Sequence, residues 1–423
     1  MTLGFKNMKP AFFKKLVILG KNNSASENDL VEFSAIKLID LKIEDKQDFR
    51  LDLKRVRFTY IQAFENFSAE STLVSFDLEE WEEILLKMDV RTENLLDLKA
   101  VAKILLPRLR DFKIETVAEY FNLDLSSGKE TEVVYHLLLT FIYRLQKLSP
   151  SVFQQLMTLS FGSKDTWGRF LTEGRKIELT DFVPSEEKDE FFLDFNPTRG
   201  EKEIGSKTDY SDVWQKEEEV LAYYQNGGPI SSQMEKFEQR KEQKIMAQAV
   251  ASAFDEGDFL LVEAGAGVGK SLAYLVPALL WAEKNKDRTI VSTNTKNLQE
   301  QLFFKDLPLL EKALPFEFKV TLLKGKKNYL CLYRLYNLIN KAEYEFPLED
   351  QKALSNLAVW AAETISGDIA ENSGFDLVKS APLWNRVCCE GSSCLNQECP
   401  HYQKCFYFKI KREALKSHLL VVN

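Results

Sequence analysis

The sequence predicts an α/β protein, and three observations support this fold class. Residues 258–275 place a short apolar run before a glycine-rich turn and an amphipathic stretch, the order expected for strand, loop and helix. Apolar runs and polar turns alternate again from 289 to 323, as in parallel strands joined by helices. Residues 1–148 combine short apolar strands with apolar residues at helical spacing.

Length and composition limit the possibilities. A chain of 423 residues has room for about three domains. A net charge of -8 argues against a protein that binds nucleic acid over its whole surface, but it leaves a local basic groove open. The chain contains no apolar run of membrane-spanning length and no leader-like start, so we expect a cytoplasmic protein without a membrane partner. All six cysteines lie between 331 and 405, which favours local metal or cluster chemistry over disulfides.

The first 148 residues form the first predicted domain. Residues 16–19 and 30–38 are apolar enough for strands, and 95–106 and 114–121 carry apolar residues at helical spacing. Segments 27–38 and 95–103 resemble proofreading exonucleases of the DEDD class, which implies a ribonuclease H-like fold.

That resemblance also implies a nuclease site, and the residues for one are missing. Such a nuclease holds two Mg²⁺ ions about 4 Å apart between carboxylates, the first pair lying on the opening strand. No Asp or Glu precedes Glu27, and the position five residues after His136 is Phe141. We therefore expect a catalytically dead, structural or docking domain, with His136 in the core or at its boundary. A 3′ to 5′ exonuclease that uses displaced carboxylates, such as Asp77 or Asp97, remains the alternative.

Residues 149–235 are predicted to be an acidic, partly helical linker, which ends near a turn signal at 226–229. The next predicted domain begins at 236.

The glycine-rich turn has the composition of a phosphate-binding loop. Glycines at 265, 267 and 269 permit positive φ and a close approach of backbone amides to phosphate, while Lys270 adds a charge and Ser271 a hydroxyl for Mg²⁺. Lys270 and Ser271 are thus the candidate catalytic residues. The whole loop is the candidate nucleotide site: Ala264, Gly265, Ala266, Gly267, Val268, Gly269, Lys270 and Ser271. Ala264 stands where the strict pattern has glycine.

One helix earlier, Arg240 and Gln243 are candidates to contact the nucleotide, because the Gln243 amide offers both a donor and an acceptor to an adenine edge. Taken alone, residues 237–246 are an ordinary amphipathic helix. Their place before the loop resembles the glutamine motif of superfamily 2 helicases, which implies ATP as ligand and a RecA-like motor domain over 236–328.

After the strand predicted at 289–292, a polar turn at 293–302 opens another helix. In the helicase family this turn contacts single-stranded DNA, so the resemblance makes Thr293, Thr295 and Gln299 the candidate DNA-binding residues. A helix cap with no further role is the alternative.

Four cysteines are candidate metal ligands: Cys331, Cys394, Cys399 and Cys405. Four thiolates can hold a [4Fe-4S] cluster or zinc, and buried thiols are the third possibility, so the spacing leaves the choice open. Cys388 or Cys389 is a spare or a substitute.

Residues 324–331 together with 394–408 resemble the iron-sulfur insert of XPD-like helicases, in the DinG branch. The resemblance implies an insert at 329–407, a return to the motor domain at 408–423, and a [4Fe-4S] cluster on those four cysteines. It also implies ATP, Mg²⁺ and single-stranded or forked DNA as ligands, with 5′ to 3′ unwinding. Basic and aromatic residues of the insert, among them Lys324, Tyr329, Tyr402 and Tyr407, are candidates to contact DNA.

Hydrolysis requires a further strand that ends in Asp-Glu, and none follows Ser271 in these residues. We therefore expect the front half of a longer helicase, which binds nucleotide and DNA without turnover. A non-catalytic nucleotide- and DNA-binding module is the competing hypothesis. The sequence does not identify a protein partner.

Overall fold

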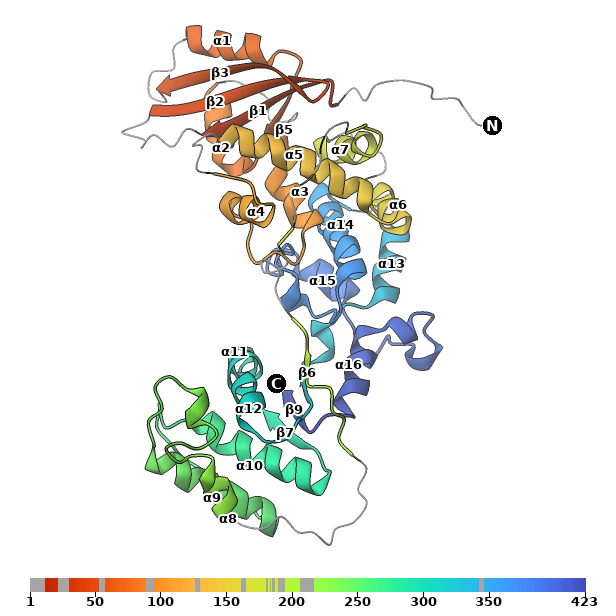
Figure 1. Cartoon of the computed structure of the whole chain (residues 1–423). Coiled ribbons are helices and arrows are strands. Elements are labelled where there is room, and N and C mark those ends of the chain that lie inside the picture. Colours follow the sequence, from red (N-terminus) through yellow and green to blue (C-terminus); the bar gives the residue numbers. More distant parts are fainter. Residues whose placement is uncertain are drawn as a thin grey trace. The chain divides into compact units, whose positions relative to one another are not determined.

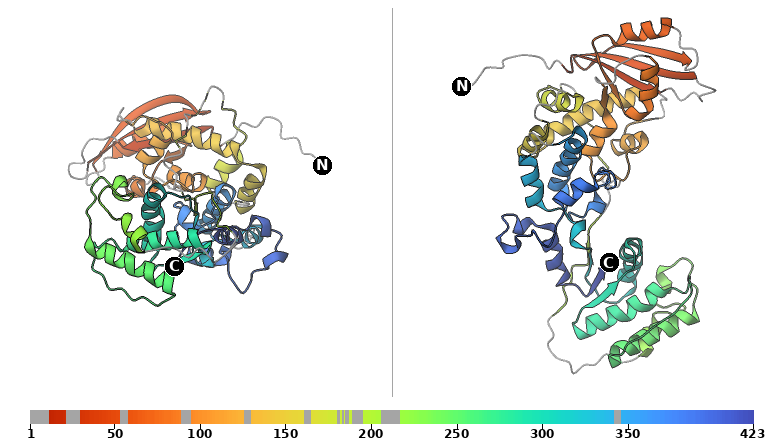
Figure 2. Two further views of the ribbon diagram at one scale, coloured as in Figure 1. Left: turned by 60° about the horizontal axis from the view of Figure 1, so that its bottom comes forward. Right: turned by 180° about the vertical axis from the view of Figure 1, so that it is seen from behind.

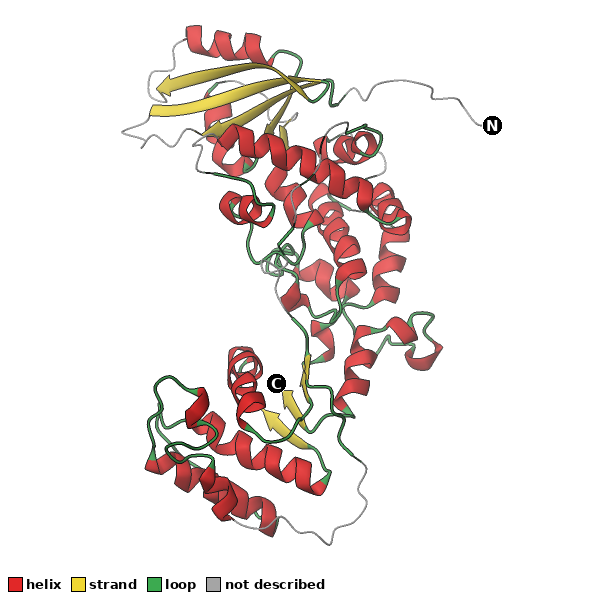
Figure 3. Ribbon diagram, in the orientation of Figure 1, coloured by secondary structure: helices red, strands yellow, loops and turns green. Residues whose placement is uncertain are grey.

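The computed structural model describes residues 12–21, 30–52, 58–88, 95–125, 130–160, 165–179, 182, 184, 187–188, 195–205, 217–341 and 346–423. Glu27 lies outside this part. The chain forms two compact units (Figure 1). Unit 1 comprises residues 1–194, 331–364 and 368–388, and unit 2 comprises 195–330, 365–367 and 389–423. Figure 3 shows their helices and strands.

Unit 1 contains a five-stranded sheet in the order β3-β2-β1-β4-β5. Its strands are β1 (Lys15–Lys21), β2 (Leu30–Ile39), β3 (Lys42–Asp52), β4 (Thr72–Ser75) and β5 (Leu95–Asp97). The first three pair antiparallel, whereas β4 and β5 continue parallel to β1. The strands predicted at 16–19 and 30–38 are confirmed, and the mixed order fits the ribonuclease H-like α/β fold expected from the sequence.

Helices cover both faces of this sheet (Figure 1). Val17 and Leu19 of β1 pack in one cluster with Phe64 of α1 (Phe58–Ser68) and Trp81 of α2 (Leu78–Lys87). The alternate side chains of β1 are also fully buried, and α5 (Glu130–Lys147) lies against β1. A strand buried on both faces explains why 16–19 is a continuous apolar run.

The helix predicted at 95–106 begins three residues later than expected. Leu95 and Leu96 pair with Leu73 and Val74 of β4, and Asp97 then caps α3 (Leu98–Leu105) by accepting from the Lys99 amide at 2.9 Å. The helix predicted at 114–121 is confirmed as α4 (Ile114–Tyr120).

The described residues of unit 1 form five further α-helices. Two follow α5 in sequence, α6 (Pro150–Leu159) and α7 (Thr166–Gly174). Three come from the segment after 331, and they are α13 (Leu332–Asn340), α14 (Leu348–Glu363) and α15 (Ala381–Val387). Figures 1 and 2 both show α14 beside α3 and α6. The larger part of the predicted insert therefore folds with the N-terminal domain.

Unit 2 contains a four-stranded sheet in the order β6-β8-β9-β7. The strands are β6 (Thr198–Arg199), β7 (Thr289–Ser292), β8 (Val320–Leu323) and β9 (Leu419–Val422). β9 pairs parallel with both β7 and β8, so the carboxyl ends of these three strands meet at one edge. The helices are α8 (Glu217–Ala222), α9 (Lys241–Glu256), α10 (Lys270–Asn285), α11 (Lys296–Gln301), α12 (Leu307–Ala313) and α16 (Phe406–Ala414).

The strand predicted at 259–262 is wrong for this structure. Residues 258–264 have no regular secondary structure, and Phe259 and Leu261 are 107% and 97% exposed. An apolar run becomes a strand only beside a hydrogen-bonded neighbour, and the described part of unit 2 places none next to it. The run therefore leaves an exposed apolar patch, the kind of surface that another polypeptide segment covers.

None of the described helices combines the length and hydrophobicity needed to cross a lipid bilayer.

Candidate nucleotide and nucleic-acid site

The glycine-rich loop leads directly into α10. Gly267 and Gly269 lie in the left-handed region, with φ of +85° and +84°. Gly265 does not, so two of the three predicted positive-φ positions are observed. Gly269 is the N-cap of α10, and Lys270 and Ser271 occupy its first turn. The first amides of a helix have no intrahelical acceptor, so the loop presents donors at the positive end of α10.

Side-chain donors occupy the carbonyl groups of this loop. The Lys270 ammonium donates to the carbonyl oxygens of Ala264 at 2.8 Å and Gly265 at 3.0 Å. The Arg240 guanidinium donates to Gly267 O, and the Gln243 amide nitrogen donates to Gly269 O at 2.9 Å. These hydrogen bonds offset the partial negative charge of the loop carbonyl oxygens, which favours binding of an anion at the backbone amides of the loop.

Arg240 and Gln243 therefore make a contact that the sequence did not predict, a contact with the loop itself. Both side chains hold the loop from the start of α9, and Gln243 is only 5% exposed. Its amide nitrogen already serves Gly269, so that group is not open to an adenine edge in this structure. Both residues thus contact the loop, and their contact with a nucleotide stays a prediction.

Two residues that the sequence pattern did not single out lie next to Ser271. Burial raises the pKa of Asp306, and the nearby Ser271 hydroxyl acts in the opposite direction. Burial likewise raises the pKa of Tyr274, against the opposite effect of the Ser271 hydroxyl. Asp306 ends the π-helical turn Leu302–Asp306, 35 positions after Ser271, so no local motif could have indicated the contact.

Of the three predicted DNA-binding residues, one is exposed and two are buried. Thr295 is exposed and caps α11 by accepting from the Leu298 amide at 3.1 Å. Thr293 is 7% exposed and donates to Val422 O at 3.2 Å. Gln299 is fully buried and donates to Leu323 O at 3.4 Å and Val421 O at 3.2 Å, linking the ends of β8 and β9. Gln299 thus links the ends of these two strands, and its contact with DNA stays a prediction.

The candidate metal ligands belong to different units. Cys331 lies in unit 1 as the N-cap of α13, whereas Cys394, Cys399 and Cys405 lie in unit 2. None of the six cysteines, all of them described, forms a disulfide. Among the described residues, no three His, Cys, Asp or Glu side chains gather closely enough to hold a metal ion. The donor chemistry of these thiols suits a soft metal.

One cysteine contact within unit 2 was not expected. The Cys389 thiol hydrogen-bonds to Cys405 and lowers the pKa of Cys405 to about 6, although burial acts in the opposite direction. Burial raises the pKa of the neighbouring Tyr407, and nearby Cys389, Cys394 and Cys405 raise it further. Cys389, predicted to be a spare or a substitute, therefore lies beside Cys405, one of the predicted ligands.

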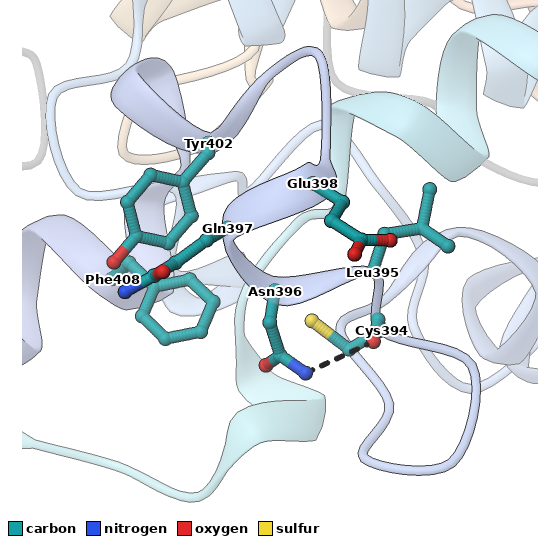
Figure 4. A pocket seen from close by; sticks show the side chains of 7 residues that line it. All are labelled: Cys394, Leu395, Asn396, Gln397, Glu398, Tyr402 and Phe408. Atoms are coloured by element: carbon teal, nitrogen blue, oxygen red, sulfur yellow. Dashed lines mark hydrogen bonds between the residues drawn. The ribbon is translucent and has the colours of Figure 1, made fainter.

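A pocket of about 640 Å³ opens beside Cys394 (Figure 4). Tyr402 and Phe408 lie on one side of it with ring centroids 4.9 Å apart, and the side chains of Asn396, Gln397 and Glu398 line the rest. The Arg412 guanidinium lies 5.9 Å from the Tyr402 ring centroid. Aromatic rings beside cations are the usual elements of a single-stranded nucleic-acid surface.

Two of the other basic and aromatic candidates are buried. Lys324 is 4% exposed and pairs with Glu300 at 3.2 Å, and Tyr329 is 1% exposed and accepts from the Lys324 amide at 3.0 Å. These two residues stabilise the core of unit 2.

The N-terminal domain lacks a gathered set of carboxylates among the described residues. β1 carries no acid, and the Lys99 ammonium pairs with Asp77 at 2.5 Å. Burial raises the pKa of Asp97 to about 6, and its side chain is used to cap α3. His136 is exposed, with Nδ1 2.8 Å from Glu132 O, which corrects its predicted place in the core or at its boundary. The Asp77 carboxylate is thus paired with the Lys99 ammonium, and the Asp97 carboxylate accepts from a backbone amide.

Comparison with known proteins agrees with this arrangement. Residues 243–335 match the family model described as DEAD/DEAH box helicase. The chain is 39% identical over 210 residues to the ATP-dependent DNA helicase YoaA of Haemophilus influenzae, covering 49% of this chain and 31% of that protein. It is 29% identical over 344 residues to the 3′-5′ exonuclease DinG of Bacillus subtilis, covering 78% of this chain and 35% of that protein.

A third relative is the ATP-dependent helicase DinG of Mycobacterium tuberculosis, 37% identical over 201 residues, which cover 44% of this chain and 30% of that protein. The chain spans about a third of the length of these curated relatives. Residues 243–335 are thus similar to a DEAD/DEAH box helicase domain. The chain is similar to part of the helicases and of the exonuclease named above.

Proposed function

We propose that this chain is the nucleotide-binding part of an ATP-dependent DNA helicase that unwinds duplexes in the 5′ to 3′ direction. The observation that carries the proposal is the loop at residues 264–271, whose carbonyls are occupied by Lys270, Arg240 and Gln243 while its amides lie at the start of α10. Lys270 would bind the terminal phosphates and Ser271 would hold Mg²⁺. The helicase names of the relatives support the same assignment.

Turnover is a separate question. No apolar run after Ser271 in these 423 residues ends in Asp-Glu, the pair that holds Mg²⁺ and orients the attacking water. That observation favours a second candidate for a polypeptide of these residues, a module that binds nucleotide and DNA without hydrolysis. Both candidate functions use the loop at residues 264–271 to bind nucleotide, and phosphate release distinguishes them.

The pocket beside Cys394 is our candidate for contact with single-stranded DNA. Replacing Tyr402 by alanine removes one ring of the aromatic pair, so we expect about tenfold weaker binding of a fluorescent single-stranded oligonucleotide, measured by anisotropy at fixed salt. Phe316→Ala, a half-buried aromatic of unit 2 outside this pocket, is the control and should keep wild-type affinity. Equal affinities for wild type and Tyr402→Ala would exclude the pocket from DNA binding.

We also propose that Cys331, Cys394, Cys399 and Cys405 hold a [4Fe-4S] cluster. The support is their thiolate chemistry, the lowered pKa of Cys405 and the resemblance to the helicase insert. Protein purified without oxygen should be brown and absorb near about 400 nm, with close to four iron atoms per chain.

Cys394→Ser should abolish that absorbance, whereas Cys388→Ala should retain it, because Cys388 is buried in unit 1 beside α15. A colourless protein that contains one zinc ion per chain would show that zinc occupies these thiols instead.

A further inference from the structure

The N-terminal domain and the insert share a buried surface within unit 1. α14 packs against α3 and α6, and α13 also packs against α6 (Figures 1 and 2). Seven consecutive residues of α14, from Leu354 to Trp360, are at most 2% exposed. Seven consecutive residues cover every side of a helix, so α14 is enclosed on all faces. Part of that enclosure comes from the N-terminal domain.

The insert also completes the hydrogen bonds of the N-terminal domain. The last carbonyls of a helix have no intrahelical donor, and the Asn356 amide donates to Lys103 O in the last turn of α3 at 2.6 Å. The Gly374 amide donates to Pro107 O at 3.2 Å, and the Ser373 hydroxyl donates to Leu109 O. A Cβ on Gly374 would lie 2.4 Å from Lys103 O, so the two backbones meet where only glycine fits.

A charge pair is buried at the same surface. Arg108 Nε lies 2.7 Å from Glu371 Oε1, and the two side chains are 20% and 1% exposed. The other oxygen of Glu371 accepts from the Thr364 hydroxyl at 2.5 Å. Glu371 and Thr364 belong to the insert and Arg108 to the N-terminal domain. Removing one partner of such a pair leaves a buried charge uncompensated, which is far more costly than losing an exposed ion pair.

The contact extends to the acids that a displaced nuclease site would use. A cavity of about 70 Å³ at Asp97, large enough for water but not for a nucleotide, is lined by Lys352 of α14. The charge of Lys352 acts on the Asp97 carboxylate. The insert therefore closes the edge of the fold at which Asp97 lies.

We propose that the N-terminal domain is the permanent docking platform of the insert, so that α13, α14 and the segment 368–388 are stable only while they are packed on α3, α6 and the residues that follow α3. This role requires no metal and no nuclease chemistry, and it is independent of the nucleotide site. Within the insert, the Cys331 backbone amide donates to Val387 O at 2.9 Å at the start of α13.

Hydrogen–deuterium exchange on the full chain tests the proposal, because each half of the surface can be altered while the other is observed. In Arg108→Glu, changed only in the N-terminal domain, we expect amides of residues 348–363 to exchange at least about tenfold faster. In Glu371→Arg we expect the same acceleration in residues 98–105 and 150–159. The charge swap Arg108→Glu/Glu371→Arg should recover part of the protection, and Lys379→Glu, an 81% exposed lysine of the same insert segment, should change neither.

Asn356→Ala serves as a milder variant in case the charge reversals unfold unit 1. It should accelerate exchange at the last turn of α3 while the protection of α10 in unit 2 stays at the wild-type level. The proposal would be overturned if residues 348–363 exchanged at the wild-type rate in folded Arg108→Glu. It would also be overturned if the last turn of α3 exchanged at the wild-type rate in Asn356→Ala. The insert would then be stable without the platform.

Discussion

Replacing Lys270 by alanine is expected to weaken binding of Mg·ATP by about 100-fold, the equivalent of roughly 3 kcal/mol for a lost charge-assisted hydrogen bond to phosphate. Lys270 contributes twice in this structure. Its ammonium supplies the positive charge of the site, and its bonds to Ala264 O and Gly265 O shape the loop before any ligand arrives. Titration with a fluorescent ATP analogue, with ATP as competitor, measures the change.

Lys284 provides the matched control. It lies on the same helix, near the end of α10, and pairs with Glu219, so Lys284→Ala removes an equal charge without touching the loop. Its affinity for Mg·ATP should match wild type. Phosphate release from wild type and from Lys284→Ala should stay at the level of Lys270→Ala. Release well above that level would contradict the expectation that these residues bind nucleotide without turnover.

Gly269→Ala is expected to lower nucleotide affinity by about tenfold or more, although it adds a single methyl group. The residue has a φ of +84°, where a side chain costs roughly 1–2 kcal/mol. In addition, a Cβ there would lie 2.2 Å from the Gln243 amide nitrogen, the group that holds the loop from α9. The methyl group therefore displaces Gln243 and releases the loop.

Gly257→Ala separates these two causes. Gly257 ends α9 with a φ of +70°, and a Cβ at that position would meet no atom within 4 Å. The variant should lose about 1 kcal/mol of folding stability and keep its affinity for Mg·ATP. Equal loss of affinity in both variants would show that backbone strain alone, rather than the contact with Gln243, explains the effect.

Local patterns in the sequence predicted the parts of the site that depend on neighbouring residues. The loop, the start of α10 at Lys270 and the strand β7 follow from glycine spacing and short apolar runs. The strand expected at 259–262 did not form, because a strand depends on a partner that local sequence cannot supply.

Local patterns could not predict contacts between residues that are distant in the sequence. Asp306 lies near Ser271 only through the packing of α10 against the turn before α12, and the ends of β8 and β9 enclose Gln299, which the sequence resemblance made a candidate DNA-binding residue. The buried Arg108–Glu371 pair joins residues 263 positions apart. In each case the sequence gives the chemical group, and the fold determines its partner.

The most direct test is a structure of the chain with a non-hydrolysable ATP analogue and Mg²⁺. The β-phosphate should lie within hydrogen-bonding distance of the amides between Gly265 and Ser271, with the Lys270 ammonium moved from the Ala264 and Gly265 carbonyls to the terminal phosphates. An analogue bound elsewhere, or a loop in which Lys270 keeps both carbonyl bonds at saturating ligand, would contradict the assignment of this chain as a nucleotide-binding motor part.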